Sequence, residues 1–142
     1  MGTYSKFKTN ISAETEGAWF DLGEAGRFKI ARSGGNNREY LKIFNRRAKP
    51  HKQLIDAGKL GEDENTKFMT EVFAEANLKG WDGVTDENGE VLAYSFENAV
   101  KLLTDLPDLF MQLLAKSQDM NNYREEVLAE SLKNSGPSSS MA

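Results

Sequence analysis

The chain has 142 residues and a formal net charge of -4, and 39% of its residues are apolar and 28% charged. This balance predicts a single globular domain, because single domains typically run to roughly 100–200 residues. With no cysteine and with His51 as its one histidine, the sequence excludes disulfides, thiolate metal sites, cysteine nucleophiles and multi-histidine metal sites. No apolar run approaches the roughly 18 residues of a membrane span and the polar N-terminus does not resemble a signal peptide, so we expect a cytosolic protein.

The N-terminal quarter of the chain predicts a β-hairpin. The first ten residues are polar, and we expect them to be irregular or to form a short edge strand. In 18–22 and 27–32, apolar residues alternate with polar ones, and the connection 23–26 has a glycine at each end. Period-two alternation around a glycine-bounded turn is typical of a hairpin. A two-stranded hairpin is marginal alone, so it must lie on an apolar surface.

Helical patterns follow between 38 and 76. Asn36 or Asn37 can cap a helix over 38–49, and Pro50 ends this helix. Its predicted inward residues are Tyr40, Leu41, Phe44 and Ala48. We expect a short turn at 52–57. A longer helix begins at the acidic residues 62–64, where the helix macrodipole favours negative charge, and its predicted core face is Phe68, Met69, Val72, Phe73 and Ala76.

The second half predicts another hairpin and three more helices. Asn88-Gly89 is a strong hairpin turn, which predicts paired strands within 79–95. Ser95 is expected to cap the next helix, Pro107 to begin another and Asp119 to cap a last one that carries Tyr123, Val127, Leu128 and Leu132. The resulting prediction is an α+β fold that is mostly α-helical, with about five helices and two small β-hairpins. It forms one domain over 1–134 with a flexible tail at 135–142.

Charge is unevenly distributed along the chain. Residues 1–60 hold twelve Lys/Arg against six Asp/Glu, whereas residues 61–142 hold six against sixteen. The basic excess is steepest within 27–52. Such a division is typical of a basic patch that binds nucleic-acid phosphates, beside an acidic half that repels them. It is equally typical of two halves that attract each other, or of a surface that steers a charged protein partner. The sequence leaves these three interpretations open.

Motifs for catalysis or metal binding are not found. The segment 82–89 fails the calcium-loop pattern in both possible registers, and Gly34-Gly35 lacks the rest of a phosphate loop. His51 has no acidic residue nearer in sequence than Asp56, and 62–64 is best interpreted as a solvated helix start. Because no nucleophile, base and orienting group come together, we expect a protein that is not an enzyme and that has no metal or cofactor.

Several residues are candidates for binding a partner. Core packing is the default expectation for Trp19 and Trp81, and an exposed interface anchor is the alternative. The apolar run 102–114 is wider than one helix face, so part of it is available for a partner or for a second copy. The candidate partner-binding residues are Arg38, Lys42, Arg46, Arg47, Trp81, Leu102, Leu106, Leu109, Phe110 and Leu113.

The central part of the chain resembles tail assembly chaperones of long-tailed bacteriophages. The resemblance is carried by Leu-Lys-Gly-Trp-Asp-Gly-Val at 78–84, by Glu-Asn-Gly at 87–89 and by Leu-Ala-Tyr-Ser at 92–95. It continues in Asn-Ala-Val-Lys-Leu-Leu at 98–103 and Leu-Pro-Asp-Leu-Phe at 106–110. It covers about residues 17–135, and its motifs are turns, caps and core positions rather than catalytic groups.

The resemblance implies a small, mostly helical chaperone in the host cell cytoplasm that is absent from the mature virion. Such proteins bind the tape measure protein and help tail tube subunits polymerise around it. Many also have a longer frameshifted form, which would recruit the tail tube protein. Homo-oligomers are compatible with this role. The alternatives are a phage nucleic-acid-binding accessory protein that uses the basic 27–52 region, and a small phage inhibitor of a host protein that uses the acidic half.

Overall fold

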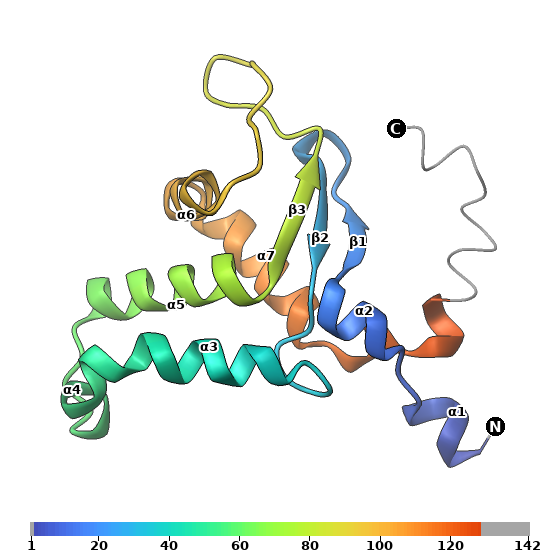
Figure 1. The fold of residues 1–142 in the computed structure, drawn as a ribbon. Helices are drawn as coiled ribbons and strands as arrows, with labels where there is room; N and C mark the ends of the chain where they lie inside the picture. The colour runs from blue at the N-terminus through green and yellow to red at the C-terminus, as the bar shows by residue number, and fades with distance from the viewer. Residues whose placement is uncertain (1, 129–142) are drawn as a thin grey trace.

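The computed structural model describes residues 2–128, which form seven α-helices and one three-stranded antiparallel sheet (Figure 1). The fold is therefore α+β and mostly helical, as predicted, and α3, α5, α6 and α7 are its substantial helices. The helices are α1 (Thr3–Phe7), α2 (Ile11–Glu16), α3 (Arg38–Ala48), α4 (Lys52–Asp56), α5 (Glu62–Ala76), α6 (Phe96–Asp105) and α7 (Pro107–Gln118). The strands are β1 (Ala18–Asp21), β2 (Arg27–Ile30) and β3 (Leu78–Asp82).

The sheet has the order β1-β2-β3, so the first predicted hairpin is confirmed. The second forms only in part, because Thr85 and Val91 make an isolated antiparallel bridge and the backbone of Leu92 donates to the carbonyl of Val84 at 2.9 Å, but no second strand follows β3 in the described residues. Instead of pairing with 91–94, β3 pairs with β2 and places Trp81 opposite Phe28. Side chains also hold the return segment: the Trp81 Nε1 donates to the carbonyl of Leu92 at 2.8 Å, and the Tyr94 hydroxyl donates to the carbonyl of Leu78 at 2.6 Å.

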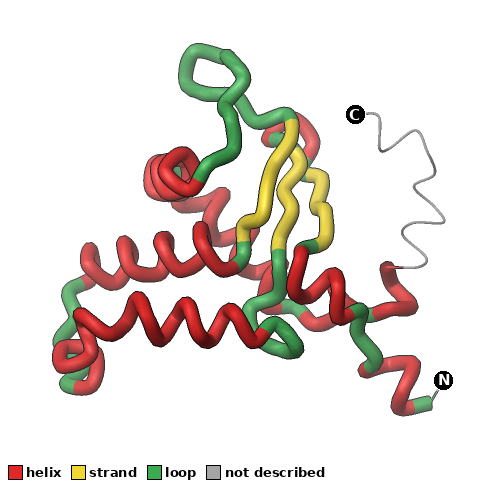
Figure 2. The backbone as a smooth tube through the Cα atoms, viewed as in Figure 1, coloured by secondary structure: helices red, strands yellow, loops and turns green. Residues whose placement is uncertain are grey.

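The helices lie behind the sheet, beside β3 and beyond the lower end of the sheet (Figure 2). In Figure 1, α7 crosses behind the sheet, and α5 runs from the lower end of β3 alongside α3. The predicted core face of α5 is confirmed, since Phe68, Val72, Phe73 and Ala76 are buried and Met69 packs against them. On α3 the prediction for Leu41 is wrong: its side chain is 59% exposed, and Ile43 is buried instead.

The N-terminal segment was predicted to be irregular or a strand, but it forms α1 and α2. The Asn10 side chain caps α2 by accepting from the backbone of Ala13. Glu14 of α2 is fully buried, where it accepts from the backbone of Asn36 at 2.7 Å and pairs with Arg32 at 3.1 Å. Short helices of this kind depend on such tertiary contacts rather than on local propensity.

The turn before α3 is built around this buried carboxylate. Gly35 has a φ of +56°, and a Cβ atom at this position would collide with the Glu14 and Arg32 side chains. Asn37 is at the N-cap of α3, but its side chain donates to the carbonyl of Arg32 and does not cap the helix. The 33–37 segment is thus a tightly packed turn that leads into α3.

The remaining boundaries follow the sequence closely. The Ser95 hydroxyl accepts from the backbone of Asn98, and Pro107 occupies the first turn of α7, as predicted. The predicted turn at 52–57 is the short helix α4. Asp119 caps a short 3₁₀ helix, Met120–Tyr123, and residues 125–128 of the predicted last helix are α-helical. Leu132 and the predicted flexible tail at 135–142 lie outside the described residues.

Candidate functional site

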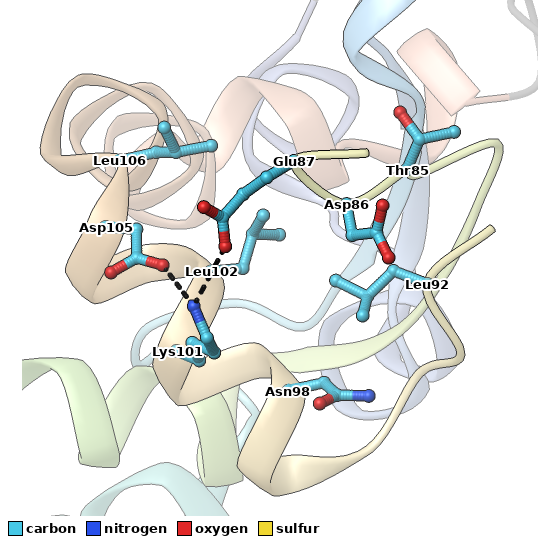
Figure 3. A pocket seen from close by; sticks show the side chains of 9 residues that line it. All are labelled: Thr85, Asp86, Glu87, Leu92, Asn98, Lys101, Leu102, Asp105 and Leu106. Atoms are coloured by element: carbon cyan, nitrogen blue, oxygen red, sulfur yellow. Dashed lines mark hydrogen bonds and ion pairs between the residues drawn. The ribbon is translucent and has the colours of Figure 1, made fainter. Parts of the chain in front are cut away.

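A hollow of about 310 Å³ opens between the 83–94 loop and α6 (Figure 3). Its volume is at the lower end of the roughly 300–1,000 Å³ of small-ligand pockets. Leu92, Leu102 and Leu106 supply its apolar surface. We call it the Leu106 groove; its lining residues are Thr85, Asp86, Glu87, Leu92, Asn98, Lys101, Leu102, Asp105 and Leu106.

The loop that forms one wall of the groove is held by its own side chains. The Asp86 carboxylate accepts from the backbone of Asn88 at 2.8 Å and of Glu90 at 3.0 Å, an arrangement that closes the turn. The Trp81 indole donates to the Leu92 carbonyl, which fixes the inner part of this wall. Asn-Gly therefore forms the predicted tight turn, and the Thr85–Val91 bridge flanks it where longer paired strands were predicted.

The rim of the groove is acidic. Lys101 Nζ lies 2.7 Å from Asp105 and 3.6 Å from Glu87, so one lysine links α6 to the loop (Figure 3). The hydrogen bond to Asp105 raises the pKa of Lys101 above its ordinary value. Asp86 adds a third carboxylate, which leaves the rim with a negative balance. An apolar side chain beside a positive charge matches this surface.

The predicted apolar run 102–114 divides between core and surface. Phe110 and Leu113 are 7% and 0% exposed, so they pack in the core and are not accessible to a partner in this conformation. Leu102 is almost buried at the base of the groove, and Leu109 is partly buried. Leu106, in contrast, is 47% exposed on the groove wall. The run is wide because it spans two helices with different neighbours: α6 packs mainly against α5, and α7 packs against β2.

The two tryptophans have different environments. Trp81 is half-buried and packs edge-to-face against Phe28 and Tyr94, with ring centroids 6.3 and 5.2 Å apart. The expectation of core packing is wrong for Trp19, which is 46% exposed with the Arg27 guanidinium 4.8 Å from its ring centre. Trp81 thus contributes to the groove from inside, by holding Leu92, rather than as an exposed anchor.

The predicted basic surface on α3 is partly neutralised by α5. Arg47 Nε lies 2.7 Å from the Glu75 carboxylate, and Arg46 pairs with the same carboxylate. Arg38 is exposed, and among the residues described Lys42 pairs only with Glu39 of its own helix, at 3.8 Å. Basic and acidic parts of the chain therefore do meet, which accounts for some of the charge division seen in the sequence.

Comparison with known proteins places the chain in a prophage family. The model of the YdaY prophage protein family matches residues 35–134, more than half of the chain. The chain belongs to this family. No curated protein matches it, and no solved structure does. All nine residues of the Leu106 groove lie within the YdaY segment, whereas α1, α2, β1 and β2 precede it.

Sequence reasoning missed part of the surface of this YdaY protein. Of the groove it identified Leu102 and Leu106, but not the carboxylates of the 83–94 loop or Lys101. The i,i+4 pair Lys101–Asp105 was a detectable sign of a structured rim. It also missed an apolar patch at the N-terminus, where Tyr4, Phe7 and Ile11 are exposed. Their spacing of three and four residues is helical, but the segment is too short for periodicity to distinguish a helix from a strand or an irregular segment.

Within 2–128, no three His, Asp or Glu side chains come together as a metal site. Nor does any helix in that range have the length and apolar character to span a membrane.

Proposed function

We propose that this YdaY family protein is a non-enzymatic phage tail assembly chaperone. The tape measure protein is its client, and an amphipathic helix of that client binds in the Leu106 groove. Tail tube subunits would then polymerise around the protected tape measure, in the host cell cytoplasm. The chaperone would leave before the virion is complete.

The observation that carries this proposal is an exposed leucine in an apolar hollow with an acidic rim. Amphipathic helices bind by burying an apolar stripe in a groove of this kind, and Leu106 provides such a surface next to Leu92 and Leu102. The negative rim favours a client helix with Lys or Arg beside its apolar residues, because charge complementarity selects partners. The prophage family and the resemblance to tail assembly chaperones supply the client.

The internal ion pairs favour this function over nucleic-acid binding. Two of the arginines that a phosphate backbone would need, Arg46 and Arg47, already pair with Glu75. A nucleic-acid interface would have to break these pairs, and it would lose affinity steeply with salt.

The test is co-expression with overlapping fragments of the tape measure protein from the same prophage, followed by pull-down and size-exclusion chromatography. We expect at least one fragment that aggregates alone to become soluble in a complex. Leu106→Asp should abolish the complex, whereas Leu54→Asp should not. Leu54 is a matched control because it is 43% exposed, close to the 47% of Leu106, and lies on α4 outside the groove.

Two outcomes would count against the proposal. If no fragment forms a complex, and the protein instead binds DNA in a salt-sensitive manner, the nucleic-acid alternative replaces it. If Leu106→Asp and Leu54→Asp bind a fragment equally well, the protein is a chaperone that uses another surface. Circular dichroism of both variants would show that each is folded.

A further inference from the structure

Residues 2–11, which we call the N-terminal arm, carry an unusual concentration of exposed apolar side chains. Tyr4 is 86% exposed, Phe7 64% and Ile11 61%. In Figure 1 the helix of this arm, α1, extends from the lower right of the molecule, beyond α2. Apolar side chains gathered in this way on a surface mark a site of interaction.

The arm is basic as well as apolar. Its charged residues are Lys6 and Lys8, and no acidic residue occurs before Glu14. Both lysines are exposed, and neither forms an ion pair with another residue of 2–128. The arm therefore has the character that the Leu106 groove requires, with large apolar side chains next to positive charges.

The arm cannot reach the groove of its own chain. Its base is attached to the C-terminal part of the domain: the carbonyl of Lys8 accepts from the backbone of Glu125 at 3.0 Å, and the carbonyl of Tyr123 accepts from the backbone of Asn10 at 2.8 Å. Figure 1 shows α1 at the opposite side of the molecule from α6 and the 83–94 loop. An arm that occupies a groove must therefore come from a second copy.

We propose that the N-terminal arm of one copy binds in the Leu106 groove of another. Phe7 and Tyr4 bury their rings against Leu92, Leu102 and Leu106, and the arm lysines face the carboxylates of the groove rim. Because arm and groove are different patches, the contact is heterologous, and repeated contacts build open chains or closed rings.

This inference concerns the free protein and holds whichever client fills the groove. It adds competition to the proposed function, since a client helix and a second copy would occupy the same leucines. Its test therefore uses the purified full chain without any phage protein. A failure here would leave the client-binding proposal standing.

The experiment measures mass against concentration by light scattering and sedimentation. We expect the wild-type protein to form species larger than dimers as concentration rises. Phe7→Asp removes the arm contact and Leu106→Asp removes the groove contact, so each variant alone should be monomeric. Leu54→Asp, the exposed-leucine control, should associate like the wild type.

Mixing the two defective variants gives the sharpest result. Phe7→Asp retains a functional groove and Leu106→Asp retains a functional arm, so an equimolar mixture should form heterodimers that cannot extend further. Monomers in this mixture, with both variants folded by circular dichroism, would overturn the proposal. So would a wild-type protein that stays monomeric at every concentration, or a Phe7→Asp variant that still forms long chains.

Discussion

The Tyr123 hydroxyl donates a hydrogen bond to the carbonyl of Ile30, with 3.0 Å between the two oxygens and both residues fully buried. This bond joins the end of the described chain to the central strand of the sheet. The Tyr123 ring also packs edge-to-face against Phe20 on β1, with centroids 6.3 Å apart. Burial raises the pKa of the Tyr123 hydroxyl well above its ordinary value, so this group remains a donor across the physiological range.

Tyr123→Phe should lower the free energy of unfolding by about 1 kcal/mol, because it removes one buried hydrogen bond while keeping the ring. Urea denaturation followed by circular dichroism measures this difference. Tyr4→Phe is the matched control, since Tyr4 is 86% exposed and should tolerate the change. Equal effects of the two substitutions would show that the Tyr123–Ile30 bond does not stabilise the fold.

Glu14 makes stability depend on pH. Burial alone would raise the pKa of Glu14, but hydrogen bonds from Thr9, Asn36 and Arg32 outweigh burial and hold this pKa below its ordinary value of 4.5. A carboxyl group with a lowered pKa in the folded state stabilises that state above the unfolded pKa. This stabilisation is lost as the pH falls below about 4.5 and through the folded pKa.

Glu14→Gln should therefore have a lower free energy of unfolding than the wild type at pH 7. This difference between the two proteins should become smaller as the pH is lowered toward about 3. Urea denaturation at a series of pH values provides the comparison. Glu24→Gln, an exposed carboxyl on the turn between β1 and β2, should follow the wild type throughout. A gap between wild type and Glu14→Gln that is constant with pH would contradict the assigned role of the ionised carboxylate.

Local features of the sequence predicted the elements that depend on local chemistry. Glycines bound the turn between β1 and β2, Ser95 caps α6, Pro107 opens α7, and a clear period of 3.6 defines α5. In each case the residues that decide the structure lie within one or two turns of one another. The predicted positions of these elements were accordingly close to the observed ones.

The predictions that were wrong concern features that depend on non-local contacts. The pairing of β3 with β2 joins strands separated by α3, α4 and α5, and no residue near 79–95 identifies β2 as the partner. The inward side of α3 depends on where α5 lies, which is why Ile43 rather than Leu41 is buried. The groove has the same origin, because its rim combines a loop and a helix that meet only after folding.

Arg47→Ala should reduce the free energy of unfolding by about 1 kcal/mol, the upper end of the range for ion pairs near the surface. The Arg47 side chain is 24% exposed, bonds Glu75 and lies 5.0 Å from the centre of the Phe96 ring, so it couples α3 to both α5 and α6. Arg46→Ala should have a smaller effect, since that side chain is 58% exposed. Thermal denaturation of the two variants tests this order of destabilisation. A larger loss of stability in Arg46→Ala than in Arg47→Ala would refute it.

Trp81→Phe should weaken binding in the Leu106 groove several-fold while lowering the free energy of unfolding by only about 1 kcal/mol. The substitution removes the indole hydrogen bond to the Leu92 carbonyl and so releases one wall of the groove. Binding in the groove is measured in two ways, by capture of a tape measure fragment and by self-association of the protein. Trp19→Phe, an exposed ring outside the groove, is the control. If Trp81→Phe unfolds more easily but binds normally, Trp81 has a structural role alone.

The boundary of the YdaY match at residue 35 passes through an intact structural unit. It separates Gly35 from the buried Glu14 against which the turn packs, and it separates β3 from β2, the only strand that pairs with it in residues 2–128. A fragment cut to 35–134 would lose Phe28 and Ile30 from the centre of the core and would expose the inner surfaces of α5 and α7. In this protein the matched segment 35–134 therefore contains only one of the three strands of the sheet, and the other two come from residues that precede it.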